Sequence, residues 1–196
     1  GGNYNVVVGD EAGTAITTGD NNVAVGYAAL DANTTGTANT AVGGSALGAN
    51  VSGSSNTAVG YNSMAVNTAA NNSAFGRSSL LVNTSGTANT AIGTDTLVAN
   101  TTASNNTAVG FSALTANTTG ASNTAVGKSA LVANSTGAYN VAVGQGALDA
   151  NTSAQYNSAL GYDALGGNTT GANNVGLGSY ALRVNTTGAS NTAVGY

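Results

Sequence analysis

Apolar and polar positions recur along this chain with a period of seventeen residues. Each copy contains an Asn-x-x-apolar-Gly motif, and the consensus of one copy reads N-T-A-V-G-x-x-A-L-x-A-N-T-T-G-x-x. The motif glycine occupies positions 9, 26, 43, 60, 76, 93, 110, 127, 144, 161, 178 and 195, so one interval has sixteen residues and the others have seventeen. Self-similarity at such a fixed period predicts a repeat architecture in which the copies stack on one another.

Each copy predicts two short strands joined by two turns. Seventeen residues are too few for a pair of helices, and no helical apolar periodicity is sustained along the chain. In the third copy, strand alternation would place Thr40 and Val42 on one face and Ala41 on the other, and the second strand would place Leu47 and Ala49 on a common face. We therefore predict an all-β fold, a parallel β-solenoid of about twelve 17-residue coils.

Residues 1–196 are expected to form a single repeat array that belongs to a longer fibre. The first coil, residues 5–21, is irregular: Gly13 stands where other copies have Leu, and Ile16 stands where they have Asn. This departure indicates a junction at that end of the array.

The coil at residues 56–71 is one residue shorter than the others. Its missing residue lies between Asn67 and Asn72, in the segment that elsewhere reads Asn-Thr-Thr-Gly-x-x. Length varies more readily in surface loops than in packed strands, so this segment is predicted to be a loop.

Two apolar columns are predicted to face each other and fill a narrow core. The residue before each motif glycine is always apolar, and the residue four positions after it is Leu or Met in ten copies. A single coil would bury too little apolar surface to offset the conformational entropy of its backbone, so stacking is required. The predicted core ladder comprises Val42, Val59, Ile92, Val109, Val126, Val143, Leu47, Leu97, Leu114, Leu131 and Leu148.

Two columns of Asn recur, the first at the start of the motif and the second in the N-T-T-G segment. Stacked amides can satisfy one another's donors and acceptors, so we expect side-chain ladders. The predicted ladders comprise Asn39, Asn56, Asn89, Asn106 and Asn123 in the first column, and Asn100, Asn117 and Asn134 in the second.

The middle residue of the first strand is expected to face outward as a strip of small apolar side chains without charge. Monomeric proteins rarely expose long contiguous apolar patches, so this strip predicts a homo-oligomer that associates along the rod. The strip comprises Ala41, Ala58, Ala74, Ala91, Ala108, Ala125 and Ala142.

The residue directly after each motif glycine varies in chemistry and is predicted to face outward. Five copies carry an aromatic residue there, and four of these residues are candidates to contact a glycan or another surface: Tyr27, Tyr61, Phe111 and Tyr162. The alternative is a surface position that simply tolerates many residue types, because single exposed apolar residues need no explanation.

The N-T-A-V-G, A-L and N-T-T-G motifs resemble the NTAVG/NTALG repeats of bacterial and phage tail-fibre-domain proteins. They are similar, more loosely, to the S-V-A-I-G head repeats of trimeric autotransporter adhesins, which use a shorter repeat. The resemblance covers essentially the whole chain. It implies a left-handed parallel β-roll, a homotrimer, an extracellular position on a cell surface or virion, and attachment to surfaces through a cell-surface or glycan receptor.

Composition narrows the chemistry further. The chain has no His and no Cys, so the usual nucleophile–base arrangements and soft metal sites are missing; we predict that it is not an enzyme and has no cofactor. Three scattered cations against seven acids argue against nucleic-acid binding. No apolar run is long enough to insert in a membrane, and no Asp column recurs as calcium-binding repeats require.

Together these patterns favour a structural or adhesive fibre segment, a rigid rod of a phage tail fibre or bacterial adhesin head that serves surface attachment. An alternative is a self-assembling extracellular filament or matrix protein without its own receptor. An ice-binding solenoid is a third hypothesis, although the paired Thr of the N-T-T-G segment are adjacent and are more typical of a turn.

Overall fold

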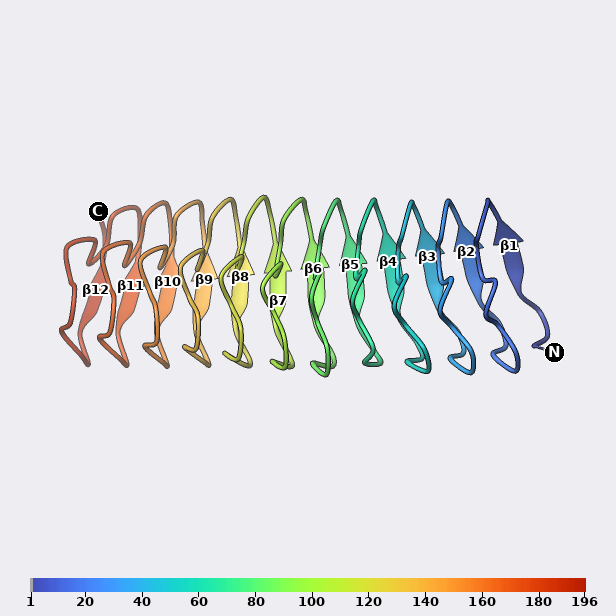
Figure 1. Cartoon of the computed structure of the whole chain (residues 1–196). Helices are drawn as coiled ribbons and strands as arrows, with labels where there is room; N and C mark the ends of the chain where they lie inside the picture. Colours follow the sequence, from blue (N-terminus) through green and yellow to red (C-terminus); the bar gives the residue numbers. More distant parts are fainter. Residues whose placement is uncertain (1) are drawn as a thin grey trace.

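The chain folds as a parallel β-solenoid, shown by a computed structural model that describes residues 2–196. Its twelve strands pair in chain order in one parallel sheet, and the two termini lie at opposite ends of the stack (Figure 1). The strands are β1 (Val6–Val8), β2 (Val23–Val25), β3 (Thr40–Val42), β4 (Thr57–Val59), β5 (Ser73–Phe75), β6 (Thr90–Ile92), β7 (Thr107–Val109), β8 (Thr124–Val126), β9 (Val141–Val143), β10 (Ser158–Leu160), β11 (Val175–Leu177) and β12 (Thr192–Val194). The predicted fold class is confirmed, and the described residues contain no helix.

Backbone hydrogen bonds join each coil to the next at both ends of every strand. At β7 the amide of Thr107 donates to the carbonyl oxygen of Asn123 at 2.9 Å, and the amide of Gly110 donates to Ile92 at 2.8 Å. All strands pair position for position, so each column of the repeat becomes a straight row along the rod. With adjacent strands about 4.8 Å apart, twelve coils extend for about 50–55 Å.

The first strand has its faces reversed relative to the prediction. Ala41, Ala58, Ala74, Ala91, Ala108, Ala125 and Ala142, predicted as an outward oligomer strip, all have no exposed surface and lie in the core. Val42, Val59, Ile92, Val109, Val126 and Val143, predicted to fill the core, point outward and are half-buried or exposed. Only the Leu part of the predicted core ladder is confirmed: Leu47, Leu97, Leu114, Leu131 and Leu148 are fully buried.

The narrow interior explains the reversal. In a representative coil the buried apolar side chains are Ala108 from the strand and Ala113 and Leu114 from the return path, so one large side chain fills the space. Asn106 is also fully buried and lies two positions before Ala108. Strand alternation places residues two apart on the same face, so the buried Asn column requires Ala to face inward and Val to face outward.

The predicted second strand is replaced by consecutive tight turns. The amide of Gly48 donates to Ser45 at 3.2 Å, and the amide of Asn50 donates to Leu47 at 3.1 Å. Ser45 and Leu47 have positive φ angles of 55° and 52°, whereas Ala46 between them does not. This alternation in the sign of φ is incompatible with a β-strand. As a result Leu47 is buried, whereas Ala49 is only half-buried and does not share its face.

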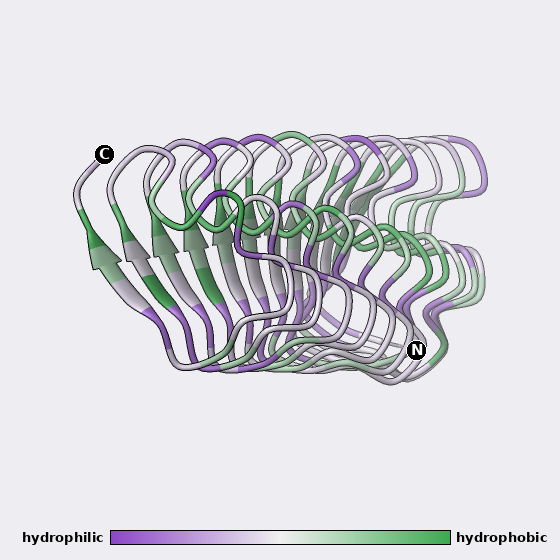
Figure 2. Cartoon of the chain, turned by 90° about the vertical axis from the view of Figure 1, so that its left-hand side faces the viewer, coloured by the Kyte–Doolittle hydropathy of each residue, from purple (hydrophilic) through white to green (hydrophobic). Residues whose placement is uncertain are grey.

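The recurrent Leu at positive φ is unusual because the left-handed conformation costs about 1–2 kcal/mol for a residue with a side chain. Full burial of a Leu side chain contributes about 1.5–3 kcal/mol, which offsets that cost. The turn also aims the Leu114 amide at the carbonyl oxygen of Ala130 in the next coil, at 3.0 Å. In Figure 2 this segment of the return path forms a hydrophobic band beside the sheet.

The second Asn column forms a continuous side-chain ladder over most of the rod. Asn117 Nδ2 donates to Asn100 Oδ1 at 3.0 Å and also to the Gly120 carbonyl oxygen at 2.9 Å. Asn134 then donates to Asn117 at 2.9 Å. These amides are fully buried, so each satisfies its neighbours in place of water, as predicted.

The first Asn column is joined chiefly through the backbone. Asn123 Nδ2 donates to the Gly137 carbonyl oxygen at 2.8 Å, and its Oδ1 accepts from the backbone amide of Asn140 at 3.0 Å. The predicted members Asn39, Asn56, Asn89, Asn106 and Asn123 are all at most 1% exposed. This column closes the corner before each strand, and direct amide-to-amide bonds are a minority in it.

The irregular first coil keeps the turn geometry of the others. Gly13 has a φ of 55° and donates to the Ala29 carbonyl oxygen at 2.9 Å, as the Leu residues do in later coils. A Cβ at Gly13 would lie 3.0 Å from Cδ1 of Ile16. The Ile16 side chain therefore fills the space left by the missing Leu, and the two departures compensate each other.

The shorter coil interrupts one ladder. Asn67 Nδ2 turns to the Ala69 carbonyl oxygen at 2.9 Å, and Oδ1 of Asn50 has no hydrogen-bond partner although it is buried. The strands on either side, β4 and β5, still pair in register. The deletion therefore lies in a loop, as predicted. Its structural consequence is the loss of a hydrogen bond to one buried acceptor, Oδ1 of Asn50.

We expect that a Ser inserted between Thr68 and Ala69 raises the melting temperature. The insertion restores the common loop length and lets Asn67 donate to Asn50, and an unsatisfied buried acceptor costs about 1–3 kcal/mol. Thermal unfolding followed by circular dichroism measures the change. The same insertion between Thr118 and Thr119, in a coil of normal length, should lower stability; a loss at both positions would show that the orphan acceptor is not limiting.

The Gly that ends each strand is required by close approach between coils. Gly110 has a φ of 130°, and a Cβ there would lie 2.6 Å from the Gly127 carbonyl oxygen. Backbone strain alone is expected to cost about 1–3 kcal/mol. Gly110→Ala should therefore lower the free energy of unfolding by more than this amount. Gly44→Ala is the control, because the nearest atom to its added Cβ would be a ring carbon of the exposed Tyr61 side chain, at 3.3 Å. Equal denaturant midpoints for the two variants would contradict this reason for the glycine column.

Candidate functional site

The outward side of the sheet is an uncharged surface that runs the length of the rod. We call it the sheet face and define it by the first and third residues of every strand. Its first column is Val6, Val23, Thr40, Thr57, Ser73, Thr90, Thr107, Thr124, Val141, Ser158, Val175 and Thr192, and its third is Val8, Val25, Val42, Val59, Phe75, Ile92, Val109, Val126, Val143, Leu160, Leu177 and Val194. None of these residues is charged.

The bulky members of the sheet face remain accessible. Ile92 is 41% exposed and Leu160 is 53% exposed, although each has a neighbouring strand on both sides. The face is therefore an apolar column beside a largely hydroxyl-bearing column. The outward alanine strip predicted from the sequence does not exist, and the uncharged outward surface is built from these two columns instead.

Charged side chains collect on the turns that follow the strands. We call the first, second and fifth positions after each motif glycine the turn face. It holds every charged residue except Asp20: Asp10, Glu11, Asp31, Arg77, Asp95, Lys128, Asp149, Asp163 and Arg183. Two ion pairs bridge adjacent coils, Arg77 to Asp95 at 2.6 Å and Arg183 to Asp163 at 2.5 Å. The rod thus has one charged surface and one uncharged surface.

The four aromatic residues predicted as surface contacts lie on the turn face. Tyr27, Tyr61, Phe111 and Tyr162 are each about half exposed, between 46% and 62%. No two of them lie in adjacent coils, so the structure does not bring them together into one patch. Tyr162 differs from the others because acidic and basic side chains surround it.

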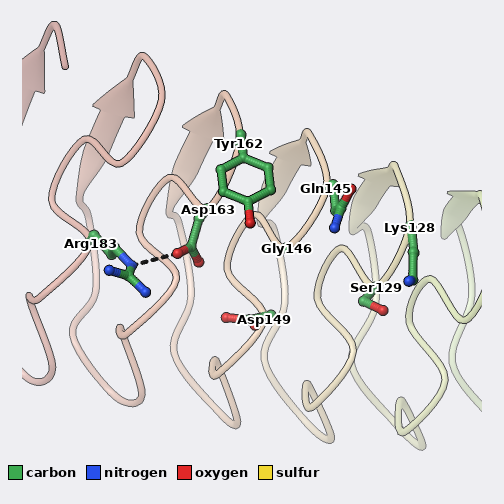
Figure 3. Close-up of a pocket in the computed structure, with 8 residues that line it drawn as sticks. All are labelled: Lys128, Ser129, Gln145, Gly146, Asp149, Tyr162, Asp163 and Arg183. Atoms are coloured by element: carbon green, nitrogen blue, oxygen red, sulfur yellow. Dashed lines mark hydrogen bonds and ion pairs between the residues drawn. The ribbon is translucent and has the colours of Figure 1, made fainter.

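A cavity of about 370 Å³ lies beside Tyr162 (Figure 3). It is lined by Lys128, Ser129, Gln145, Gly146, Asp149, Tyr162, Asp163 and Arg183, which come from four successive coils. A neighbouring cavity shares Asp149, Asp163 and Arg183 and continues toward Gly166, Gly167, Val184 and Thr186. The lining combines carboxylates, an amide, cations and one aromatic ring.

Sequence reasoning did not find this site, because its lining residues come from four different coils. Asp149 is the fifth residue after the motif glycine of its coil, and Asp163 is the second residue after the motif glycine of the next coil. Stacking of the two coils makes their carboxylates neighbours. A second signal was available: Gly146 is the only Gly among the regular copies in the second position after the motif glycine, so its coil lacks a side chain there.

The electrostatics of the cavity act on Asp149. Partial burial raises the pKa of this carboxyl above its ordinary value of 3.8, and the negative charge of Asp163 raises it further. Hydrogen bonds from the backbone amides of Asp149 and Ala150 and the charge of Arg183 lower the pKa in part. The folded protein therefore holds the Asp149 proton more tightly than the unfolded chain does.

Among the described residues, no group of three or more His, Cys, Asp or Glu could hold a metal ion. Within that same stretch of chain, no helix could cross a bilayer.

We expect Asp149→Asn to raise the melting temperature at pH 7. Because the pKa of Asp149 is raised in the folded state, ionisation of this carboxyl disfavours folding. Its contribution to stability therefore falls as the pH rises from 3.8 through the pKa of the folded state. The advantage of the variant should vanish when the pH falls below 3.8. Asp31→Asn is the control, since Ser45 occupies the place that Asp163 takes. A benefit of Asp149→Asn that is independent of pH, measured by thermal unfolding, would contradict this assignment.

Comparison with known proteins adds no identity to these surfaces. No protein-family model matches the sequence, and neither the curated proteins nor the solved structures include a significant match.

Proposed function

We propose that this chain is a rigid segment of an extracellular fibre, in which copies of the chain associate side by side through the sheet face. The observation that carries the proposal is the uncharged sheet face, which extends over all twelve strands while nearly every charged residue lies on the turn face. The segment would act as a spacer in a surface-attachment structure, on a cell surface or a virion. The fibre class rests on the resemblance of the repeats to tail-fibre-domain proteins.

Rod stiffness supports the role of a spacer. Every coil is tied to its neighbours by backbone hydrogen bonds on both sides of the strand and by buried Asn columns at two corners. In a stack of this kind each coil depends on its neighbours for stability. Bending the rod would stretch several of these bonds at once, so the array resists deformation along its whole length.

The dimensions of the sheet face favour self-association. Three strand residues span about 10 Å and twelve strands about 50 Å, which gives an uncharged surface of about 500 Å². The apolar third column makes up about half of this area, and a contiguous exposed apolar strip of this kind is typical of an interaction site. The straight columns repeat at the same spacing in every copy, so parallel chains can pair along the whole face.

A closed cyclic arrangement would bury this face on every copy at once. The resemblance to trimeric fibres and adhesins makes three the expected number. In such an assembly the sheet faces meet at the axis and the charged turn faces remain in water. A self-assembling filament without a receptor would use the same contact and differs only in lacking a ligand site on the turn face.

Ice binding remains a second candidate because of one observation on the same face. Thr107 and Thr124 pair in register with outward hydroxyls, and similar Thr or Ser residues continue the column on most strands. The adjacent Thr of the loops had argued against this function, but the strand column does not share that objection. Ice binding requires a free sheet face, whereas fibre assembly covers it, so the two functions exclude each other at this surface.

Replacing Ile92, Val109 and Val126 together by Lys should lower the mass of the assembly to that of one chain. Three charges would be buried at the contact without partners. Light scattering at micromolar concentration measures the mass, and circular dichroism reports whether the β-solenoid persists.

The matched control places Lys at Val98, Thr115 and Val132, on the turn faces of the same three coils. Other coils carry charged residues in this column, so the assembly should keep its mass. A monomeric unmodified chain would overturn the fibre contact, and a monomer that also shows thermal hysteresis would favour ice binding.

A further inference from the structure

We propose that the cavity beside Tyr162 binds a neutral oligosaccharide. This inference deepens the proposed function, since it would supply the fibre with a receptor site, but it concerns the turn face and not the sheet face. It rests on the shape of the cavity, on its balanced charge and on the exposed aromatic ring.

The cavity exists because one side chain is missing. Most regular coils carry Ser, Asn or Asp at the second position after the motif glycine, whereas the ninth coil has Gly146. A Cβ at Gly146 would lie 3.7 Å from Oδ1 of Asp163 and 3.9 Å from Oδ2 of Asp149. The floor is therefore backbone, with a carboxylate on either side.

The lining matches the hydroxyl groups of a sugar. Asp149 and Asp163 can each accept two O–H hydrogen bonds, and Gln145 can both donate and accept. Asp163 is fixed by Arg183, whose Nε donates to it at 2.5 Å. Fixed carboxylates around a concave surface are suited to a ligand with several hydroxyls in a defined geometry.

Charge balance selects a neutral ligand. Two carboxylates, Asp149 and Asp163, face two cations, Lys128 and Arg183. A phosphate or an acidic sugar would meet the carboxylates, and a free cation would meet only two acidic groups beside two positive charges. A neutral polyol avoids both conflicts, because it needs hydrogen bonds and not a counter-charge.

The Tyr162 ring provides the apolar component of the site. The side chain is 46% exposed, and Figure 3 shows it beside Gly146 with its hydroxyl directed toward the cavity. The ring packs edge-on against Tyr180, with centroids 5.2 Å apart, which restrains its orientation. An aromatic face can pack on the C–H side of a pyranose while the polar groups bind its hydroxyls.

A chain of sugars fits better than a single one. The second cavity continues past Arg183 and shares three residues with the first. Both cavities include residues of the ninth to eleventh coils, and the second reaches later positions of those coils, so a linear oligosaccharide would extend from the turn face toward the N-T-T-G segment. No residue of either cavity belongs to a strand, and so assembly through the sheet face leaves the site open.

Isothermal titration calorimetry of the full chain with cellohexaose, maltohexaose and chitohexaose tests the proposal. At least one hexasaccharide should bind, and Gly146→Ser should weaken that binding by about tenfold or more, a change of about 1.4 kcal/mol. Ser is the residue that several other coils carry at this position with a similar φ, so the variant fills the cavity without disturbing the fold. Tyr162→Ala should weaken binding to a similar extent.

Tyr156→Ala is the matched control, since Tyr156 is an exposed tyrosine that lines neither cavity; its binding should equal that of the unmodified chain. Failure of all three sugars to bind, or equal binding by Gly146→Ser, overturns the site. Calcium chloride alone raising the melting temperature, with loss of the effect in Asp149→Asn, would instead identify a cation site. Light scattering on the same samples reports the assembly separately, so failure of the sugar site and failure of the fibre contact are distinguishable.

Discussion

The close approach of successive coils at the glycine that ends each strand is the constraint on which the rest of the structure depends. At Gly110 there is no room for a side chain beneath the next coil. The absence of a side chain there allows the coils to approach to hydrogen-bonding distance, and the backbone hydrogen bonds hold the strands in register. Once the register is constant, like residues stack on like residues, and the columns of the sequence become rows of the surface and the core.

The period, the position of the first strand in each copy and the buried Leu column could be predicted because they depend on repetition and on burial of the largest aliphatic side chain. The faces of the strand could not be assigned by hydrophobicity, because Val and Ala are both apolar. The residue that decides the orientation is polar. Asn106 is buried in the first Asn column, and Ala108, two positions later, lies on the same face and therefore also points inward. A buried amide column is invisible to any rule that places polar side chains outside.

The return path escaped prediction for a different reason. An alternating pattern of small and large residues favours a strand, but here Leu114 takes a positive φ of 51° and continues a run of turns. This conformation is stabilised by the neighbouring coils, which bury the Leu side chain and accept a hydrogen bond from its amide. The intrinsic conformational preference of Leu does not include these contacts. The cavity beside Tyr162 was missed because its carboxylates meet only through the coil-to-coil offset.

The absence of a side chain at Gly146 allows a ligand to bind at one defined coil of a repetitive rod. The columns that are constant along the rod offer a ligand the same surface in every coil, so only the variable positions of the turn face can distinguish one coil from another. Removal of a single side chain breaks that equivalence and marks one height among twelve. If parallel copies align in register, as the proposed assembly requires, their cavities lie on one ring around the fibre, and a branched or clustered ligand could bridge them with a gain in avidity.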